Sequence, residues 1–150
     1  MKLIFTNKQE INNYLKDYQI IYNEYGKPYI KENKFYFNKS HSKDLSVLIM
    51  DDKECGIDIE QIRKYNKKMA NKILSKEEIE YINSKNKKDY FFTLIWTLKE
   101  SYLKALGTGI NIPLNNISFV KNNKIKFKQK SYNFKIIKIH NYIVTSCRKD

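Results

Sequence analysis

The order of apolar and polar positions changes along the chain, and each change predicts a different kind of element. After Thr6, apolar side chains recur with the spacing i, i+3, i+4 and i+7 from Ile11 to Tyr18, which predicts a helix with Thr6 as its N-cap. The segment EYGKPYI (24–30) contains a glycine and a proline and predicts a turn into extended chain. Runs rich in β-branched and aromatic residues then predict three strands, KFYFNKSHS (34–42), DLSVLIM (44–50) and CGIDIEQI (55–62).

Helical spacing returns in the middle of the chain and gives way to alternation after Pro113. SKEE, which starts at Ser75, is a capping box that opens a short helix through Ile82. A long helix is predicted from Asp89 to a stop signal at Gly107. Beyond it, alternation predicts an antiparallel meander with lysines on its solvent face, and the whole pattern predicts an α+β fold. The expected meander strands lie at 117–119, 125–127, 132–136 and around 143, with turns at KNNK (121–124) and HN (140–141).

Length and composition predict one globular domain over residues 1–150. The chain is long enough for one core, and 41% hydrophobic residues with 14% aromatics exclude general disorder. Two cysteines far apart in the sequence, with no CxxC, predict reduced thiols. The apolar start is too short for a signal peptide, and no apolar run approaches the roughly 18 residues of a membrane span. We therefore expect a cytoplasmic protein with no membrane partner.

The formal net charge of +13 favours an anionic partner. Charge alone leaves open nucleic acid, a membrane surface, a phosphorylated cofactor and an acidic protein. However, all basic residues except Arg63 and Arg148 are lysines, whereas arginine is the residue preferred for bidentate contacts with bases and phosphates. This composition argues against nucleic acid.

A row of polar residues crosses the predicted long helix. Nearly all positions beside the row are apolar, so the helix is expected to be buried and the row to meet a site or a water channel. The alternative is that Glu100 and Lys104 form a surface ion pair worth about 0.3–0.5 kcal/mol. The polar row consists of Thr93, Thr97, Glu100, Ser101 and Lys104.

The strand GIDIE (56–60) places two carboxylates on one face. Side chains alternate along a strand, so Asp58 and Glu60 point the same way, with their Cα atoms about 6.6 Å apart. Two such charges repel each other, and a hard divalent cation such as Mg²⁺ would relieve the repulsion. A solvated strand edge with two acidic residues is the alternative.

Taken together, GIDIE and WTLKESYLKALG (96–107) resemble the signature of the 4′-phosphopantetheinyl transferases, G-[IV]-D-[IV]-E followed by W-[ST]-x-K-E-[SA]-x-x-K. Every signature position is matched. Upstream, EYGKPYI and FNKSHS (37–42) resemble two further motifs of the surfactin-synthetase-activating, or Sfp-like, branch. The resemblance implies the 4′-phosphopantetheinyl transferase fold. It also implies a complete C-terminal lobe over 55–150, with antiparallel sheet and long helix, and a shortened N-terminal lobe over 1–54.

The resemblance implies a Mg²⁺-dependent transfer of 4′-phosphopantetheine from coenzyme A to a serine of an acidic acyl or peptidyl carrier protein, with release of adenosine 3′,5′-bisphosphate. By motif position, Asp58, Glu60 and Glu100 would hold the metal. Glu100 would also take the serine proton, directly or through a water on the metal. Lys104 would contact the diphosphate, and Lys99 would help to place the serine or a phosphate.

Other binding residues are also implied only by the resemblance. Lys27, Ser40 and His41 would line the coenzyme A pocket, with His41 bonded to a phosphate oxygen. From the residues alone, His41 beside two serines is a hydrogen-bonded loop histidine. Trp96 is interpreted as a core aromatic and stays outside the catalytic set. Gly107 is explained equally well by a helix stop and by close approach to the cofactor.

One departure from the pattern and one likeness to a second branch of the family leave alternatives open. Only about twenty residues precede EYGKP, where the Sfp-like branch has most of a lobe, so groups that clamp the ribose 3′-phosphate are absent or replaced. KALGTGI (104–110) resembles the trimeric holo-acyl-carrier-protein synthases, whereas GKPY (26–29) and SHS (40–42) resemble the single-chain branch, so a monomer is expected and a homo-oligomer stays open. Competing hypotheses are a non-catalytic nucleic-acid-binding module and a degenerate transferase that only binds carrier protein. The former leaves the acidic residues unexplained.

Overall fold

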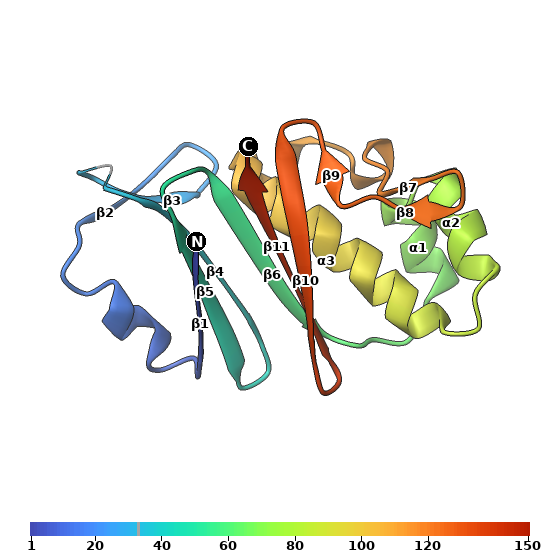
Figure 1. Ribbon diagram of the computed structural model, residues 1–150, viewed down its shortest axis with the longest axis horizontal. Helices are drawn as coiled ribbons and strands as arrows, with labels where there is room; N and C mark the ends of the chain where they lie inside the picture. The colour runs from blue at the N-terminus through green and yellow to red at the C-terminus, as the bar shows by residue number, and fades with distance from the viewer. Residues whose placement is uncertain (33) are drawn as a thin grey trace.

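Two antiparallel sheets and one long helix form three layers in the computed structural model, which describes residues 1–32 and 34–150 (Figure 1). The first sheet has the strand order β1-β5-β4, with β1 at Lys2–Thr6, β5 at Leu45–Asp51 and β4 at Tyr36–Ser42. Its strands form antiparallel pairs, with Leu3 opposite Ile49 and Ser40 opposite Val47. Alternation in β5 therefore directs Val47 and Ile49 toward the second sheet.

The second sheet has the strand order β6-β11-β10-β9. Its long strands are β6 at Cys55–Gln61, β11 at Tyr142–Lys149 and β10 at Tyr132–Ile139, and β9 is the short strand Lys128–Gln129. Apolar side chains of β5, β6 and β11 form a shared core between the two sheets. The outer face of this sheet is covered by helix α3, Lys88–Leu106, drawn in yellow and orange in Figure 1.

Smaller elements close both ends of the molecule. The hairpin β2–β3 and the helices α1 and α2 lie at opposite ends in Figure 1. Within the described part of the chain, no helix is long and apolar enough to cross a membrane. The bounds are β2 Ile20–Tyr22, β3 Pro28–Ile30, α1 Lys67–Ile73, α2 Lys76–Asn83, β7 Val120–Lys121 and β8 Lys124–Ile125, with 3-10 turns at Ile11–Tyr14, Gly109–Asn111 and Leu114–Asn116.

Polar side chains of β4 join the two sheets. The outer edge of β6 would otherwise leave backbone N–H groups without partners, which is costly inside a protein. Side chains of β4 accept these bonds at every second residue, so the two strands run side by side without a backbone ladder. The N–H groups of Ile57, Ile59 and Gln61 donate to Asn38 Oδ1, Ser40 Oγ and Ser42 Oγ at 3.1, 3.4 and 3.2 Å.

Helix α3 approaches β6 closely because the second residue of β6 is a glycine, Gly56. A Cβ atom on Gly56 would lie 2.0 Å from the carbonyl oxygen of Ser101 and 2.6 Å from the backbone nitrogen of Ala105. Farther along, the ring of Tyr102 packs edge-on against Phe134, with ring centroids 6.0 Å apart. These contacts fix the helix against the sheet.

The α+β architecture, the three predicted strands of the first half and the two helices predicted in the middle of the chain are confirmed. The capping box of α2 is present, with Glu78 N donating to Ser75 Oγ and Ser75 N donating to the Glu78 carboxylate. Helix α3 ends as expected at Gly107, whose φ of 67° is left-handed. The KNNK turn is a tight hairpin with positive φ at Asn122 and Asn123.

Other predicted elements are wrong. Thr6 ends strand β1 instead of capping a helix, and only a 3-10 turn follows at Ile11–Tyr14. The apolar spacing there serves a small cluster beneath the first sheet, in which Ile11 and Leu15 pack against Leu48. No strand forms at 117–119, β8 ends before residue 127, and the sequence interpretation missed α1.

Replacing Gly56 with alanine is expected to destabilise the protein by about 3 kcal/mol, at the upper end of the range for overpacking, because both close atoms belong to the backbone of α3. The measurement is urea unfolding followed by circular dichroism. Gly26→Ala is the control: no atom lies within 4 Å of its Cβ position, and its positive φ alone should cost about 1–2 kcal/mol. Equal losses in the two variants would contradict a steric role for Gly56.

Candidate functional site

Two adjoining pockets lie between β4 and α3, one bordered by β6 and the other by the turn at 25–28. The acidic pocket has a volume of about 400 Å³ and the glycine pocket one of about 210 Å³, and both are lined by Glu100 and Lys104. The acidic pocket is further lined by Lys39, Ser40, His41, Asp58, Glu60 and Trp96. The glycine pocket is further lined by Tyr25, Gly26, Lys27, Pro28, Asn38, Leu103, Gly107 and Gly109.

Asp58 is the buried centre of the acidic pocket. Its Oδ1 accepts hydrogen bonds from Lys104 Nζ at 2.7 Å and from Ser40 Oγ at 3.0 Å. Its Oδ2 is buried and has no hydrogen-bond partner among residues 1–32 and 34–150. Burial raises the pKa of Asp58, and the ammonium of Lys104 opposes that rise. One carboxylate oxygen is therefore available to a further ligand.

Glu100 and Glu60 place two more carboxylates around the same space. Glu100 is half-buried, and its pKa is raised first by burial and then by the negative charge of Asp58. The carboxylate of Glu60 forms an ion pair with Arg63, with Nη2 2.7 Å from Oε2. The Arg63 guanidinium in turn lies over the ring of Trp96, 5.2 Å from its centroid.

The acidic pocket offers oxygen ligands that suit a hard divalent cation. Asp58, Glu60 and Glu100 all line it, and the unpartnered Oδ2 of Asp58 is a free ligand atom. Within the described chain, however, no three His, Cys, Asp or Glu side chains form a ready-made metal cage. Mg²⁺ usually takes only one or two carboxylates, with waters and substrate phosphate completing its shell. The residues therefore fit an open Mg²⁺ site.

Most of the predicted site residues come together here. Ser40 Oγ also accepts a hydrogen bond from Lys104 Nζ at 3.0 Å, and His41 is exposed at the pocket wall. Lys27 lines the neighbouring glycine pocket, but its Nζ donates to the carbonyl of Ala105 near the end of α3. Burial lowers the pKa of Lys27.

Lys99 lies elsewhere, which corrects the expectation that it helps to place the serine or a phosphate. Its side chain is 1% exposed, lines neither pocket and forms a 2.6 Å ion pair with Glu78 of α2. Glu78 also accepts a hydrogen bond from Phe119 N at 2.7 Å. Lys99 therefore joins α2, α3 and the segment after Pro113. Its Nζ donates to the carbonyl oxygens of Ile73, Leu114 and Ile117 at 2.8, 2.8 and 2.6 Å.

The polar row of α3 splits between the site and the sheet. Glu100 and Lys104 face the pockets, whereas the hydroxyl groups bond back to carbonyls of their own helix. Thr145 of β11 donates to the carbonyl of Thr97 at 2.6 Å, which ties that part of the helix to the sheet. The hydroxyls that bond back belong to Thr93, Thr97 and Ser101.

Two residues at the acidic pocket, Trp96 and Arg63, were not predicted from the sequence to belong to the site. Trp96 is half-buried and lines the acidic pocket, and its Nε1 has no partner in the described structure. A signal was available, because Trp96, Glu100 and Lys104 are spaced i, i+4 and i+8 and so share one helix face. Arg63 lies three residues after Glu60, beyond the end of β6, where strand alternation no longer predicts direction.

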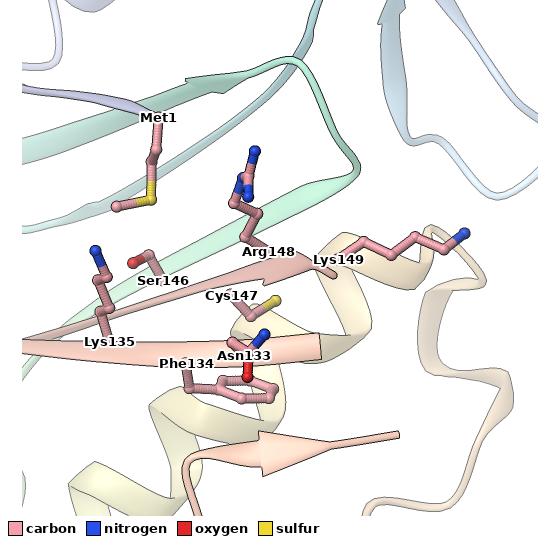
Figure 2. A pocket seen from close by; sticks show the side chains of 8 residues that line it. All are labelled: Met1, Asn133, Phe134, Lys135, Ser146, Cys147, Arg148 and Lys149. Atoms are coloured by element: carbon pink, nitrogen blue, oxygen red, sulfur yellow. The ribbon is translucent and has the colours of Figure 1, made fainter. Parts of the chain in front are cut away.

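Another cavity, of about 440 Å³, lies between the start of β1 and the strands β10 and β11 (Figure 2). No acidic residue and none of the predicted site residues line it. Two of its cations are already paired, Arg148 with Asp51 at 2.7 Å and Lys149 with Glu54 at 3.1 Å. The chemistry therefore favours the acidic pocket as the candidate site.

Comparisons with known proteins agree with the motifs. The family model described as the 4′-phosphopantetheinyl transferase superfamily matches residues 54–147. The 4′-phosphopantetheinyl transferase gsp of Aneurinibacillus migulanus is 39% identical over 102 residues, which cover 67% of this chain and 43% of the relative. Sfp of Bacillus subtilis (strain 168) is 37% identical over 99 residues, covering 63% of this chain and 44% of the relative. The chain thus spans less than half the length of these relatives.

A solved structure shows the same fold. The holo-[acyl-carrier-protein] synthase of Thermotoga maritima matches with a TM-score of 0.54 at 23% sequence identity. The match covers 65% of this chain and 62% of that one. At this level of identity the likeness establishes the fold alone.

Replacing Lys99 with methionine is expected to lower the free energy of unfolding by about 3–5 kcal/mol, because the change leaves the carboxylate of Glu78 buried without its cation. Urea unfolding measures the loss. Lys88→Met, at an exposed position of the same helix, is the control and should change stability by no more than about 0.5 kcal/mol. A Lys99 variant as stable as this control would contradict the structural role.

Replacing Glu100 with glutamine is expected to raise the melting temperature in metal-free buffer at pH 8 by about 2–4 °C. The pKa of Glu100 in the fold is raised above its ordinary 4.5. Its contribution to stability is therefore present below that ordinary value and lost as pH rises through the folded value. The difference between the two proteins should close near pH 4. The control is Glu80→Gln, at an exposed position of α2. A Glu100 variant whose melting temperature at pH 8 differs from that of the wild type no more than the control's does would contradict the prediction.

Proposed function

The chain belongs to the 4′-phosphopantetheinyl transferase superfamily, and we propose that it transfers 4′-phosphopantetheine from coenzyme A to a serine of an acyl or peptidyl carrier protein. The observation that carries the proposal is the meeting of Asp58, in the acidic pocket, with Glu100 and Lys104, which line both the acidic and the glycine pocket. These residues occupy the signature positions of the family. The names of the relatives, 4′-phosphopantetheinyl transferases, support the same reaction class.

In the proposed step, the serine oxygen of the carrier attacks the phosphorus that bears pantetheine. A new phosphorus–oxygen bond forms while the bond from that phosphorus to the bridging oxygen breaks, and adenosine 3′,5′-bisphosphate leaves. The serine proton passes to the carboxylate of Glu100. A carboxylate whose pKa is raised by burial is suited to this task, because a base works best when its pKa approaches the working pH.

Three groups would balance the negative charge of the diphosphate: the metal ion, Lys104 and His41. Asp58, Glu60 and Glu100 would hold Mg²⁺, which when bound neutralises charge that develops on the leaving phosphate. Lys104 would contact the diphosphate directly, and His41 would bond one of its oxygens. Ser40 supports this arrangement, since its hydroxyl contacts both Asp58 and Lys104.

The glycine pocket would receive another part of coenzyme A. Gly107 and Gly109 have φ values of 67° and 62°, a conformation that favours glycine and lets a ligand approach the backbone closely. Lys27 lies beside them and would contribute its charge on leaving the carbonyl of Ala105.

Further features of the whole protein belong to the same proposal. Residues 1–54 would form an N-terminal lobe and 55–150 the C-terminal lobe, acting as a monomer in the cytoplasm. The net charge of +13, mostly lysine, suits an acidic carrier protein.

The proposal predicts that the purified protein, given Mg²⁺, coenzyme A and a panel of apo carrier proteins, adds the mass of phosphopantetheine to at least one carrier. Asp58→Ala, Glu60→Ala and Glu100→Ala should each abolish this addition, because each removes a proposed metal ligand. Mass spectrometry of the intact carrier is the measurement. Lys88→Gln, at the far end of α3, is the matched control and should keep wild-type turnover. Turnover by all three alanine variants at limiting Mg²⁺ would overturn the metal assignment.

A further inference from the structure

Lys104 binds the carboxylate of Asp58, which a metal ion in the acidic pocket would also bind. Its Nζ reaches from α3 to Asp58 Oδ1 on β6 at 2.7 Å and to Ser40 Oγ on β4 at 3.0 Å. The Lys104 side chain is 30% exposed, whereas that of Asp58 is 6% exposed. A partly exposed lysine can leave its partners, but the buried carboxylate cannot follow it into solvent.

The carboxylate of Asp58 can accept one more strong partner than the two it has in the described chain. Both present hydrogen bonds reach Oδ1, and Oδ2 is buried without a partner in the described chain. A cation that approaches Oδ2 comes within a few ångströms of the ammonium of Lys104 on the other oxygen of the same group. Two cations at that separation repel each other strongly in a half-buried site.

The ammonium of Lys104 also has a second position within reach. It lines the glycine pocket as well as the acidic pocket, so rotation of its long side chain can carry the ammonium from Asp58 toward a ligand shared by both spaces. An anionic group there would receive the charge that the metal displaces.

We propose that Lys104 is the resident counter-ion of Asp58, that a divalent cation competes with it for this carboxylate, and that the diphosphate of coenzyme A accepts the displaced ammonium. This inference rests on the proposed function, because it assumes that cation and coenzyme A share the site. The exchange couples the two ligands: each binds more tightly when the other is present, by the same factor in both directions. Lys104 thus opposes the metal alone and favours the metal with coenzyme A.

The test is Mn²⁺ binding to the full chain, followed by electron paramagnetic resonance, with and without coenzyme A. Lys104→Gln removes the competing charge and keeps a hydrogen-bonding side chain. It should bind Mn²⁺ about tenfold more tightly than the wild type when coenzyme A is absent. The factor by which coenzyme A strengthens Mn²⁺ binding should shrink by a similar amount, because the displaced ammonium no longer contributes.

Control variants separate competition from general effects. Lys104→Arg keeps the charge and should stay near wild-type Mn²⁺ affinity. Lys88→Gln removes the same charge from an exposed position at the other end of α3 and should leave the affinity unchanged. Asp58→Asn should lose Mn²⁺ binding. Thermal unfolding of each variant checks that the fold is intact.

The outcomes distinguish this inference from the proposed function. Mn²⁺ affinity that is unchanged or weaker in Lys104→Gln would overturn the competition even if the protein transfers phosphopantetheine. Absence of Mn²⁺ binding in wild type and variants alike would overturn it as well. The predicted order of affinities in a protein that modifies no carrier would support the competition and count against the transferase activity.

Discussion

The joint between β4 and β6 is the contact on which the site depends. Side chains of β4 satisfy the outer edge of β6, so the two sheets meet without a shared backbone ladder. Asn38, Ser40 and Ser42 point toward β6, and the alternate residues of β4, Lys39 and His41, line the acidic pocket. Ser40 serves both purposes, since its hydroxyl accepts from the backbone of Ile59 and donates to the carboxylate of Asp58. Loss of this joint would therefore loosen the fold and the site together.

The fold was predictable where local signals and tertiary packing agree. The capping box at Ser75, the glycine stop at 107 and the alternating strands of the first half are short-range features, and each is present. The structural likeness to a holo-[acyl-carrier-protein] synthase confirms the fold class. The predicted helix after Thr6 failed because Ile11 and Leu15 pack into a cluster with Leu48, and only a 3-10 turn forms there. Thr6, its predicted N-cap, instead pairs with Ser46 of β5. That pairing joins residues some forty positions apart, which local periodicity cannot reveal.

The grouping of residues in the candidate site was predictable from motif positions more than from physics. Strand alternation placed Asp58 and Glu60 correctly on a common face, and helix periodicity placed Glu100 with Lys104. Periodicity could not assign Lys99, because its partners lie in α2 and in the segment after Pro113, far along the chain. Trp96 was missed for a different reason. An aromatic in an apolar helix is usually a core residue, and only its spacing from Glu100 indicates the pocket.

Two lysines on one helix, Lys99 and Lys104, differ in how completely their surroundings fill the bonding capacity of the ammonium. Lys99 has a carboxylate and three carbonyl oxygens around its ammonium and is closed off from solvent, so its bonding capacity is filled by the fold. Lys104 has one carboxylate and one hydroxyl and stays partly exposed. A filled shell fixes a cation, because any movement leaves several buried acceptors unpaired. An incompletely filled shell leaves bonding capacity for a ligand, and Lys104, whose shell is incomplete, is the one of the two that lines the acidic pocket.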